Sequence, residues 1–345
     1  MSKQTKSPMS YIKSISLISF LFLFSLSTFA CTTFVLQKDS SLVFGRNLDW
    51  VSDDGAIIVN SRNTKKTALV FPPEQPVTWT SKYGSISFNQ FGKEFPFGGI
   101  NEKGLVVEIM LVAGNYPKKD NRPALNELQW IQYQLDNSLS VEEVIASDKL
   151  IRISKANQNL HFLVCDKKGN TAVIEFSSKG MTVYQGNDLP IPVLENDTYF
   201  TSLEKNENKQ NCRFRSAANM LAKYNPKSNS PIEYSFTILD KVALAGSWSI
   251  VYDIKNMEIH FKTSSNKSLR KVSVDEFDFS CKKLGKLYDL KQKDKGNIGG
   301  KFQNYSAKTN RNFLKAALKS NGIRFEEIIL ERFYNYAGSC FCLEG

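Results

Sequence analysis

The pattern of apolar and polar positions from residue 31 onward changes between strand-like and helical in long runs. Short alternating apolar segments bounded by turn residues predict strands. Helical periodicity appears over 125–135 and 213–224, and a capping box, Ser140 with Glu143, precedes a helix at 141–146. The predicted strands cover residues 32–36, 42–45, 56–60, 68–71, 85–89, 104–112, 161–165, 171–176, 180–184, 247–253 and 258–263.

Strands and helices that come in separate runs indicate the fold class. They predict an α+β protein with layered, mostly antiparallel sheets, and they disfavour a doubly wound parallel fold. Turn residues at 38–41 and 166–170 predict hairpins between neighbouring strands. The chain has 345 residues, of which 41% are apolar and 23% charged, so it is able to bury a large core.

The first thirty residues have the layout of a signal peptide. Three lysines within 3–13 precede an acid-free apolar run at 15–29, and small residues, Thr28 and Ala30, stand before the predicted scissile bond. Cleavage after Ala30 would leave Cys31 first and would make the protein periplasmic or secreted.

Two alternatives to a cleaved signal peptide remain open. One is an uncleaved membrane anchor, although no stop-transfer pattern follows the apolar run. The other is a lipoprotein signal that would acylate Cys31, although Thr28 stands where such signals usually carry leucine. Beyond residue 30 no segment is apolar and long enough to span a bilayer, so we expect no stable membrane insertion after cleavage.

The C-terminal part differs in composition from the rest. Residues 282–306 are rich in Lys, Asp, Gly, Asn and Gln, which predicts a linker, and short helices are predicted at 312–319 and 326–334. We therefore divide the mature chain into a main domain at 31–280 and a basic linker with a helical extension at 281–345, packed on the same domain.

Charge and residue counts exclude several kinds of partner. The net charge is +11, but the lysines are scattered and cluster only within 282–295, so we expect no nucleic-acid binding. With two histidines and no Cys-x-x-Cys, we expect no metal site and no cofactor.

Six cysteines allow disulfides in an exported protein. If Cys31 stays free, at least one other is unpaired or bridges chains, and Cys340 or Cys342 is a candidate for a disulfide near the C-terminus.

Residues near Cys31 supply the parts that amide hydrolysis needs, namely a nucleophile and a base. His161 and His260 lie in apolar strand patterns and are expected to be structural. An α-amine freed before Cys31, with an ordinary pKa of about 8, could instead take the proton of its own thiol. Arg46 would favour the thiolate and Asp49 would orient the amine. The alternative is a surface Arg–Asp pair beside a buried cysteine.

A set of ordered strings resembles one known family. CTTF at 31–34 and FGRNLDW at 44–50 closely resemble the start of the choloylglycine hydrolase family, which includes bile salt hydrolases and penicillin V acylases. Further matches follow in order at residues 98–105, 161–166, 170, 173–176, 193–196, 213–214 and 248–253. The resemblance covers about 31–280, and its strength lies in the ordered set rather than in any single string.

The resemblance implies a four-layer αββα N-terminal-nucleophile hydrolase that cleaves linear amide C–N bonds. In such an enzyme Cys31 would be nucleophile and, through its amine, base, with Arg46 and Asp49 as charge partners. Asn196 would position nucleophile and substrate, and Arg213 would stabilise the site electrostatically. A turn residue at Asn196 and a surface charge at Arg213 are the plainer alternatives.

One position departs from the family pattern. Where many members carry an oxyanion-hole asparagine this chain has Leu111, so the oxyanion would rest on backbone N–H groups or on another side chain such as Asn115. The missing donor also keeps open a non-catalytic amide-binding protein on the same scaffold.

The resemblance implies a small N-acyl amide as substrate and allows a homotetramer. Penicillin V, a conjugated bile salt or an N-acyl homoserine lactone would fit, and lipid amides or peptidic N-acyl groups are the alternatives. Five aromatic residues are candidates for either an acyl pocket or the core: Trp50, Trp79, Tyr83, Phe88 and Phe91.

Overall fold

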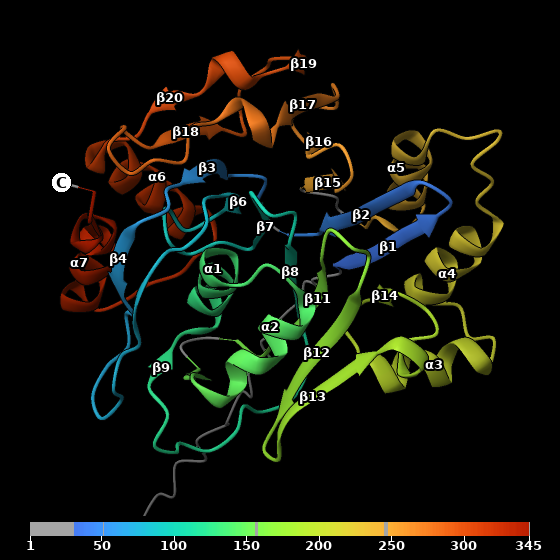
Figure 1. Ribbon diagram of the computed structural model, residues 1–345, viewed down its shortest axis with the longest axis horizontal. Helices are drawn as coiled ribbons and strands as arrows, with labels where there is room; N and C mark the ends of the chain where they lie inside the picture. Colours follow the sequence, from blue (N-terminus) through green and yellow to red (C-terminus); the bar gives the residue numbers. More distant parts are fainter. Residues whose placement is uncertain (1–30, 51, 156–157, 245–247, 345) are drawn as a thin grey trace, which may run out of the picture.

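Two large sheets form the centre of the molecule (Figure 1). The computed structural model describes residues 31–50, 52–155, 158–244 and 248–344. The predicted signal peptide therefore lies outside the described residues. The first sheet consists, in spatial order, of β14 (Val193–Leu194), β1 (Thr32–Lys38), β2 (Ser41–Leu48), β15 (Trp248–Asp253), β16 (Glu258–Thr263), β17 (Arg270–Ser273) and β19 (Gly296–Asn297).

The second sheet is longer, and all its neighbouring strands are antiparallel. Its spatial order is β13 (Gly180–Gln185), β12 (Thr171–Ser177), β11 (Leu160–Cys165), β8 (Val106–Leu111), β7 (Gly98–Asn101), β6 (Ser85–Asn89), β3 (Ala56–Asn60), β18 (Lys286–Asp289) and β20 (Gln303–Asn304). Two small sheets pair β21 (Phe341–Cys342), β4 (Thr64–Thr67) and β5 (Thr78–Thr80), and β9 (Ala124–Leu125) with β10 (Arg152–Ile153).

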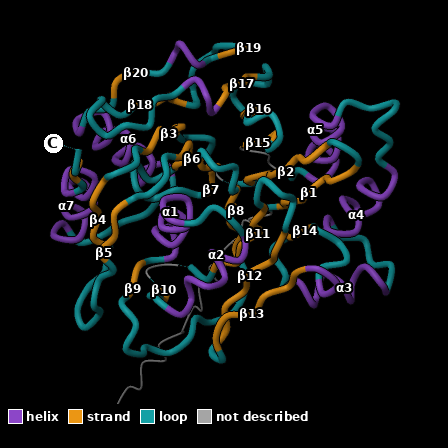
Figure 2. The backbone as a smooth tube through the Cα atoms, in the orientation of Figure 1, coloured by secondary structure: helices purple, strands orange, loops and turns teal. Residues whose placement is uncertain are grey.

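Helices cover the outer faces of the two sheets, so the order of layers is helix, sheet, sheet, helix (Figure 2). The helices are α1 (Glu127–Asn137), α2 (Val141–Ala146), α3 (Tyr199–Glu207), α4 (Arg213–Lys223), α5 (Pro231–Val242), α6 (Ala307–Ser320) and α7 (Glu327–Tyr336). Helix α5 packs on β2 and β15, α4 packs on β1, and α1 packs on β7 and β8. Helices α6 and α7 lie on the opposite side of the molecule from α3, α4 and α5 (Figure 1).

Strand β2 lies between β1 and β15 and carries contacts to both neighbouring layers. Its side chains alternate, so Arg46 points between the sheets, where its guanidinium reaches Glu108 on β8. The next residue, Asn47, points outward and donates a hydrogen bond to the Leu239 carbonyl of α5 at 2.6 Å. Gly45 also faces outward, where a Cβ atom would lie 2.3 Å from the Phe34 ring, so only glycine lets that ring cover the strand.

Several elements differ from the sequence-based expectations. Residues 68–71 form no strand, because the backbone N–H and carbonyl of Leu69 bond to the side chains of Gln129 and Asn126 instead of to a neighbouring strand. The helices α3 and α5 were not predicted, although Ser230, which caps α5, and Pro231 in its first turn are ordinary start signals.

The segment expected to be a linker is part of the sheets. Its strand β18 pairs with β3 and its strand β19 pairs with β17. Leu287 and Tyr288 are buried there despite the charged residues around them, and this burial holds the segment on the body of the protein.

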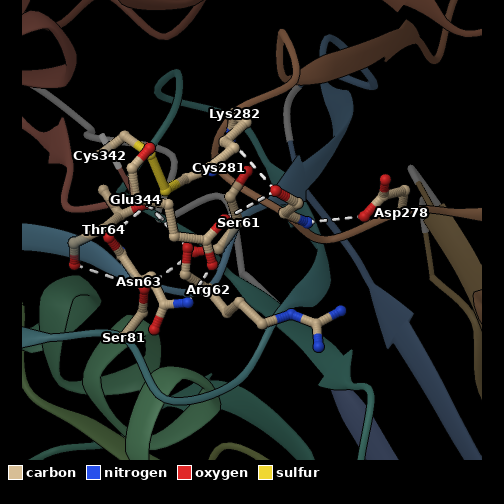
Figure 3. The surroundings of a disulfide bond; sticks show 11 residues. Ser61, Arg62, Asn63, Thr64, Ser81, Asp278, Cys281, Lys282, Cys342 and Glu344 are labelled. Carbon is tan, nitrogen blue, oxygen red and sulfur yellow. Dashed lines mark hydrogen bonds between the residues drawn. A yellow bond between two sulfur atoms is a disulfide. The ribbon is translucent and has the colours of Figure 1, made fainter.

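A disulfide joins Cys281 to Cys342 and closes a segment with a sequence separation of 61 (Figure 3). Cys31, Cys165, Cys212 and Cys340 have free thiols. Among the described residues, no helix combines the length and apolar character that a bilayer span requires.

Candidate functional site

Cys31 lies directly before β1, at the edge where the two sheets face each other. Thr33, two residues on, contacts Met110 of β8, so alternation along the strand directs Cys31 to the same inner face. Cys31 as a whole is 3% exposed. Burial raises the pKa of the Cys31 thiol, while the Arg46 charge and a hydrogen bond from the backbone N–H of Asp49 oppose that rise.

Asn196 holds the nitrogen of Cys31. Strand β14 pairs with β1, and this pairing brings the residues after Leu194 to the start of β1. The Cys31 nitrogen donates to Asn196 Oδ1 at 2.8 Å, and Asn196 Nδ2 donates to the Leu111 carbonyl at 2.9 Å. In the full chain this nitrogen belongs to the peptide bond with Ala30. Cleavage of that peptide bond would turn the nitrogen into an amine that already has an acceptor.

Arg213 fixes the backbone at the same place. It is the first residue of α4, and its Nη1 donates to the Cys31 carbonyl at 2.8 Å. Its Nη2 donates to Asn196 Oδ1 at 3.2 Å, and Nε lies 3.8 Å from the Glu195 carboxylate. The arginine therefore holds both the backbone of Cys31 and the side chain that accepts from the Cys31 nitrogen.

Arg46 belongs to a buried network that the sequence did not reveal. Its Nε lies 2.6 Å from Glu108 Oε2, and both side chains have no exposed surface. The Tyr252 hydroxyl donates to Glu108 Oε1 at 2.5 Å. Burial raises the pKa of Glu108 to about 7, against the opposing attraction of Arg46. The only sequence signal was a single acid within the apolar strand at 106–111.

Asp49 is also buried beside Cys31. Its Oδ1 accepts a hydrogen bond from the backbone of Leu244 at 3.2 Å. The hydrogen bond that the Cys31 nitrogen donates goes to Asn196, a role for which the sequence favoured Asp49. The Asp49 carboxylate remains close enough to Cys31 to act on the thiol electrostatically.

A cavity of about 510 Å³ opens in front of Cys31 and Arg46. Most of its lining is apolar, and Trp50, Phe91 and Phe97 belong to it. Trp79, Tyr83 and Phe88 do not line it, and of these Trp79 and Phe88 are buried in the core. Polar side chains line one part of the wall: Glu74, Asn126, Glu127, Ser154, Lys155 and Gln158.

The family model for linear amide C–N hydrolases of the choloylglycine hydrolase family matches residues 31–223. The chain belongs to this family. It is therefore a linear amide C–N hydrolase, and the match begins at the cysteine around which the site is built. Among the described residues, no group of three or more His, Cys, Asp or Glu side chains is arranged to hold a metal ion.

Two curated relatives of this hydrolase are named for penicillin V and for bile salts. The penicillin V acylase of Pectobacterium atrosepticum is 24% identical over 349 residues, which cover 81% of this chain and 90% of the relative. The bile salt hydrolase/transferase of Clostridium perfringens is 29% identical over 185 residues, covering 49% of this chain and 54% of the relative.

Solved structures confirm the predicted four-layer fold. The penicillin V acylase of Agrobacterium tumefaciens has a TM-score of 0.70 at 23% identity, and the match covers 80% of this chain and 98% of that one. A mutant form of the conjugated bile acid hydrolase of Clostridium perfringens has a TM-score of 0.62 at 19% identity, covering 80% and 96%.

Strand register fixes the direction of the N–H of Leu111, the residue that stands where the family resemblance implies an asparagine. Val112 donates to Asn159 of the neighbouring chain segment, so the N–H of Leu111 points away from β11. On its other side β8 pairs with β7. The hydrogen bond furthest along β8 on this side runs from the Ile109 N–H to the carbonyl of Phe97, the residue before β7. The Leu111 N–H thus faces the side where the partner strand has ended, next to Asn196. Asn115 is exposed and does not line the cavity.

Both histidines lie in ion-pair geometry away from Cys31. His161 Nδ1 is 3.0 Å from Glu175, and His260 Nε2 is 3.1 Å from Glu258. Neither histidine lines the cavity. The five residues that the sequence singled out for the site lie together. Each histidine instead pairs with a glutamate within a sheet.

Proposed function

We propose that this hydrolase cleaves N-acyl amides with Cys31 as an N-terminal nucleophile, after removal of residues 1–30. The observation that carries the proposal is the hydrogen bond from the Cys31 nitrogen to Asn196 at 2.8 Å, beside a thiol that opens on an apolar cavity. The proposal includes export to the periplasm or the medium, because a signal peptidase would supply the free terminus.

In the first step the Cys31 α-amine accepts the thiol proton and the sulfur attacks the amide carbonyl carbon. The carbonyl oxygen becomes an oxyanion, for which the Leu111 N–H and Asn196 Nδ2 are candidate donors. The protonated amine then gives its proton to the leaving nitrogen as the C–N bond breaks. Arg46 favours the thiolate, and Asn196 and Arg213 keep the terminus oriented.

In the second step water replaces the amine product at the acyl thioester. The Cys31 amine takes a proton from that water and the new C–O bond forms. The C–S bond then breaks, and the amine returns the proton to the sulfur, which regenerates the thiol and the neutral amine. The net reaction is amide plus water to carboxylic acid plus amine. The protein needs no cofactor for either step, because base and nucleophile belong to the same residue.

We propose as substrates amides that join an apolar acyl group to a polar amine. Support comes from a cavity with an apolar lining and one polar side. Penicillin V, conjugated bile salts and N-acyl homoserine lactones are the first compounds to assay, and the names of the relatives include penicillin V and bile salts.

The test combines protein chemistry with turnover. Intact mass and N-terminal sequencing of the exported protein should give Cys31 as first residue, and iodoacetamide should abolish amine release. Cys31→Ala should have no turnover, while Cys165→Ala, at a buried cysteine of β11, serves as the matched control and should retain it. Full activity in Cys31→Ala would end the proposal, and a retained leader on an active enzyme would end the role of the amine.

A further inference from the structure

The apolar part of the cavity includes a wall built by the C-terminal helices. Six lining residues come from beyond residue 306, outside the segment 31–223 that matches the family model, and all six are apolar. Leu314 and Leu318 lie one turn apart on α6, and Ile329 and Phe333 lie one turn apart on α7. The turn between the helices adds Ile323 and Phe325.

This hairpin, α6–α7, is attached directly to the catalytic end of β2. Trp50, which follows Asp49, donates its indole N–H to Asn321 at the end of α6. The Trp50 ring packs edge-on against Phe97 at 6.1 Å. Because all of these rings also line the cavity, one continuous apolar surface runs from the nucleophile to the helices.

Further contacts hold the hairpin against the loops beside the cavity. The ring of Phe333 lies 5.1 Å from that of Phe95. The side chain of Asn310, on α6, accepts a hydrogen bond from the Lys93 backbone at 2.8 Å. The Arg332 guanidinium lies 4.6 Å from the centroid of the Phe71 ring, and Phe71 also lines the cavity.

The chain after α7 is fastened covalently as well. The Cys281–Cys342 disulfide ties it to the first residue after the main domain (Figure 3). Strand β21 also pairs with β4 of the main domain. The Leu343 N–H donates to the Asn63 carbonyl at 2.9 Å, and Glu344 accepts a hydrogen bond from Ser280 at 2.8 Å. The hairpin is thus held both by its own contacts and by the chain that follows it, so its position is fixed. A surface that limits the length of a substrate needs such a fixed position.

We propose that the α6–α7 hairpin sets the length of the acyl chain that this hydrolase accepts, and that the preferred acyl group is an unsubstituted hydrocarbon chain. This inference rests on the proposed function, since the chain in question is the acyl half of the amide cleaved at Cys31. The six wall residues offer no polar side chain. Hydroxyl groups on a substrate pressed against them would lose their hydrogen bonds to water without replacement, whereas methylene groups gain from burial.

The test is a series of para-nitroanilides with linear acyl chains from butyryl to hexadecanoyl. In the wild type kcat/KM should rise about fourfold for each methylene that the cavity buries, until the chain reaches the hairpin. Ile329→Trp fills the cavity and should move the optimum to shorter chains, with a loss of roughly tenfold or more for the longest productive chain. Ile328→Trp is the matched control, because Ile328 is 72% exposed and does not line this cavity.

Two further measurements keep the proposal open to refutation. If Ile329→Trp does not fold, Leu318→Ala shortens the wall and should move the optimum to longer chains. Calorimetry of free fatty acids of different length measures how binding affinity depends on the same wall. It requires no turnover, so it separates this inference from the nucleophile role of Cys31. Identical chain-length profiles in the wild type, Ile329→Trp and Leu318→Ala would overturn the proposal, as would tighter binding of hydroxylated acyl groups than of plain ones.

Discussion

Replacing Glu108 with glutamine tests whether burial raises the pKa of the carboxyl behind Arg46. Glu108 is completely buried between the sheets, 2.6 Å from Arg46 and 2.5 Å from the Tyr252 hydroxyl. Burial raises its pKa to about 7, because the loss of water outweighs the attraction of the guanidinium. Glutamine has nearly the same shape and can still hydrogen-bond, but it does not titrate.

The raised pKa of Glu108 fixes the sign and the size of its contribution to the pH dependence of stability. In the unfolded chain a glutamate has a pKa of about 4.3. Between that value and about 7 the folded protein binds a proton at Glu108 that the unfolded chain does not. The stability from this group is therefore fully present below the unfolded pKa and is lost as pH rises through the folded one. The slope is about 1.4 kcal/mol per pH unit, or about 3 to 4 kcal/mol over the whole interval.

The assay is urea unfolding of the wild type and Glu108→Gln at several pH values between about 4.5 and 7.5. The free energy of unfolding of the wild type, relative to the variant, should fall by about 1.4 kcal/mol per pH unit. Glu207→Gln, on the exposed end of α3, controls for the loss of one negative charge. Parallel curves for the wild type and Glu108→Gln would refute the reasoning, because the pKa of Glu108 would then be the same in both states.

Three further predictions concern the site, the sheet and the disulfide. Asn196→Ala should lower kcat/KM roughly hundredfold or more without a large change in melting temperature, and a loss below threefold would contradict its role at the oxyanion. Gly45→Ala should cost about 1 to 3 kcal/mol in urea unfolding, since its Cβ would lie 2.3 Å from the Phe34 ring, and an unchanged midpoint would show that the ring moves freely. Replacing Cys281 and Cys342 with serine should cost about 4 kcal/mol, and equal midpoints with and without reductant in the wild type would show that the bond does not form.

The parts of the fold that the sequence predicts are those with local signals. The hairpin of β1 and β2 follows from alternation and from a turn in which Asp39 adopts a positive φ of 51°. Burial of the segment at 286–289 could not be predicted in the same way, because its charged composition resembles that of a linker. Its place in the sheet comes from Leu287 and Tyr288 packing against distant strands.

The residues of the candidate site also divide into those with a local sequence signal and those without one. Cys31, Arg46 and Asp49 are close in sequence, so a hairpin was enough to bring them together. Asn196 and Arg213 needed the family resemblance, since the hydrogen bonds that hold them span more than 160 residues. Glu108 carried a weak signal, and the C-terminal wall of the cavity carried none, because contacts across the whole chain are decided by tertiary packing.

The alternating contacts of β2 restrict how the chain length can vary during evolution. Arg46 and Asn47 are adjacent, yet one serves the interior between the sheets and the other serves α5. One residue inserted before them in the strand would exchange their faces, putting a guanidinium under a helix and an amide beside Glu108. Insertions and deletions in natural variants should therefore be confined to the turn at 39–40, where an added residue alters neither face.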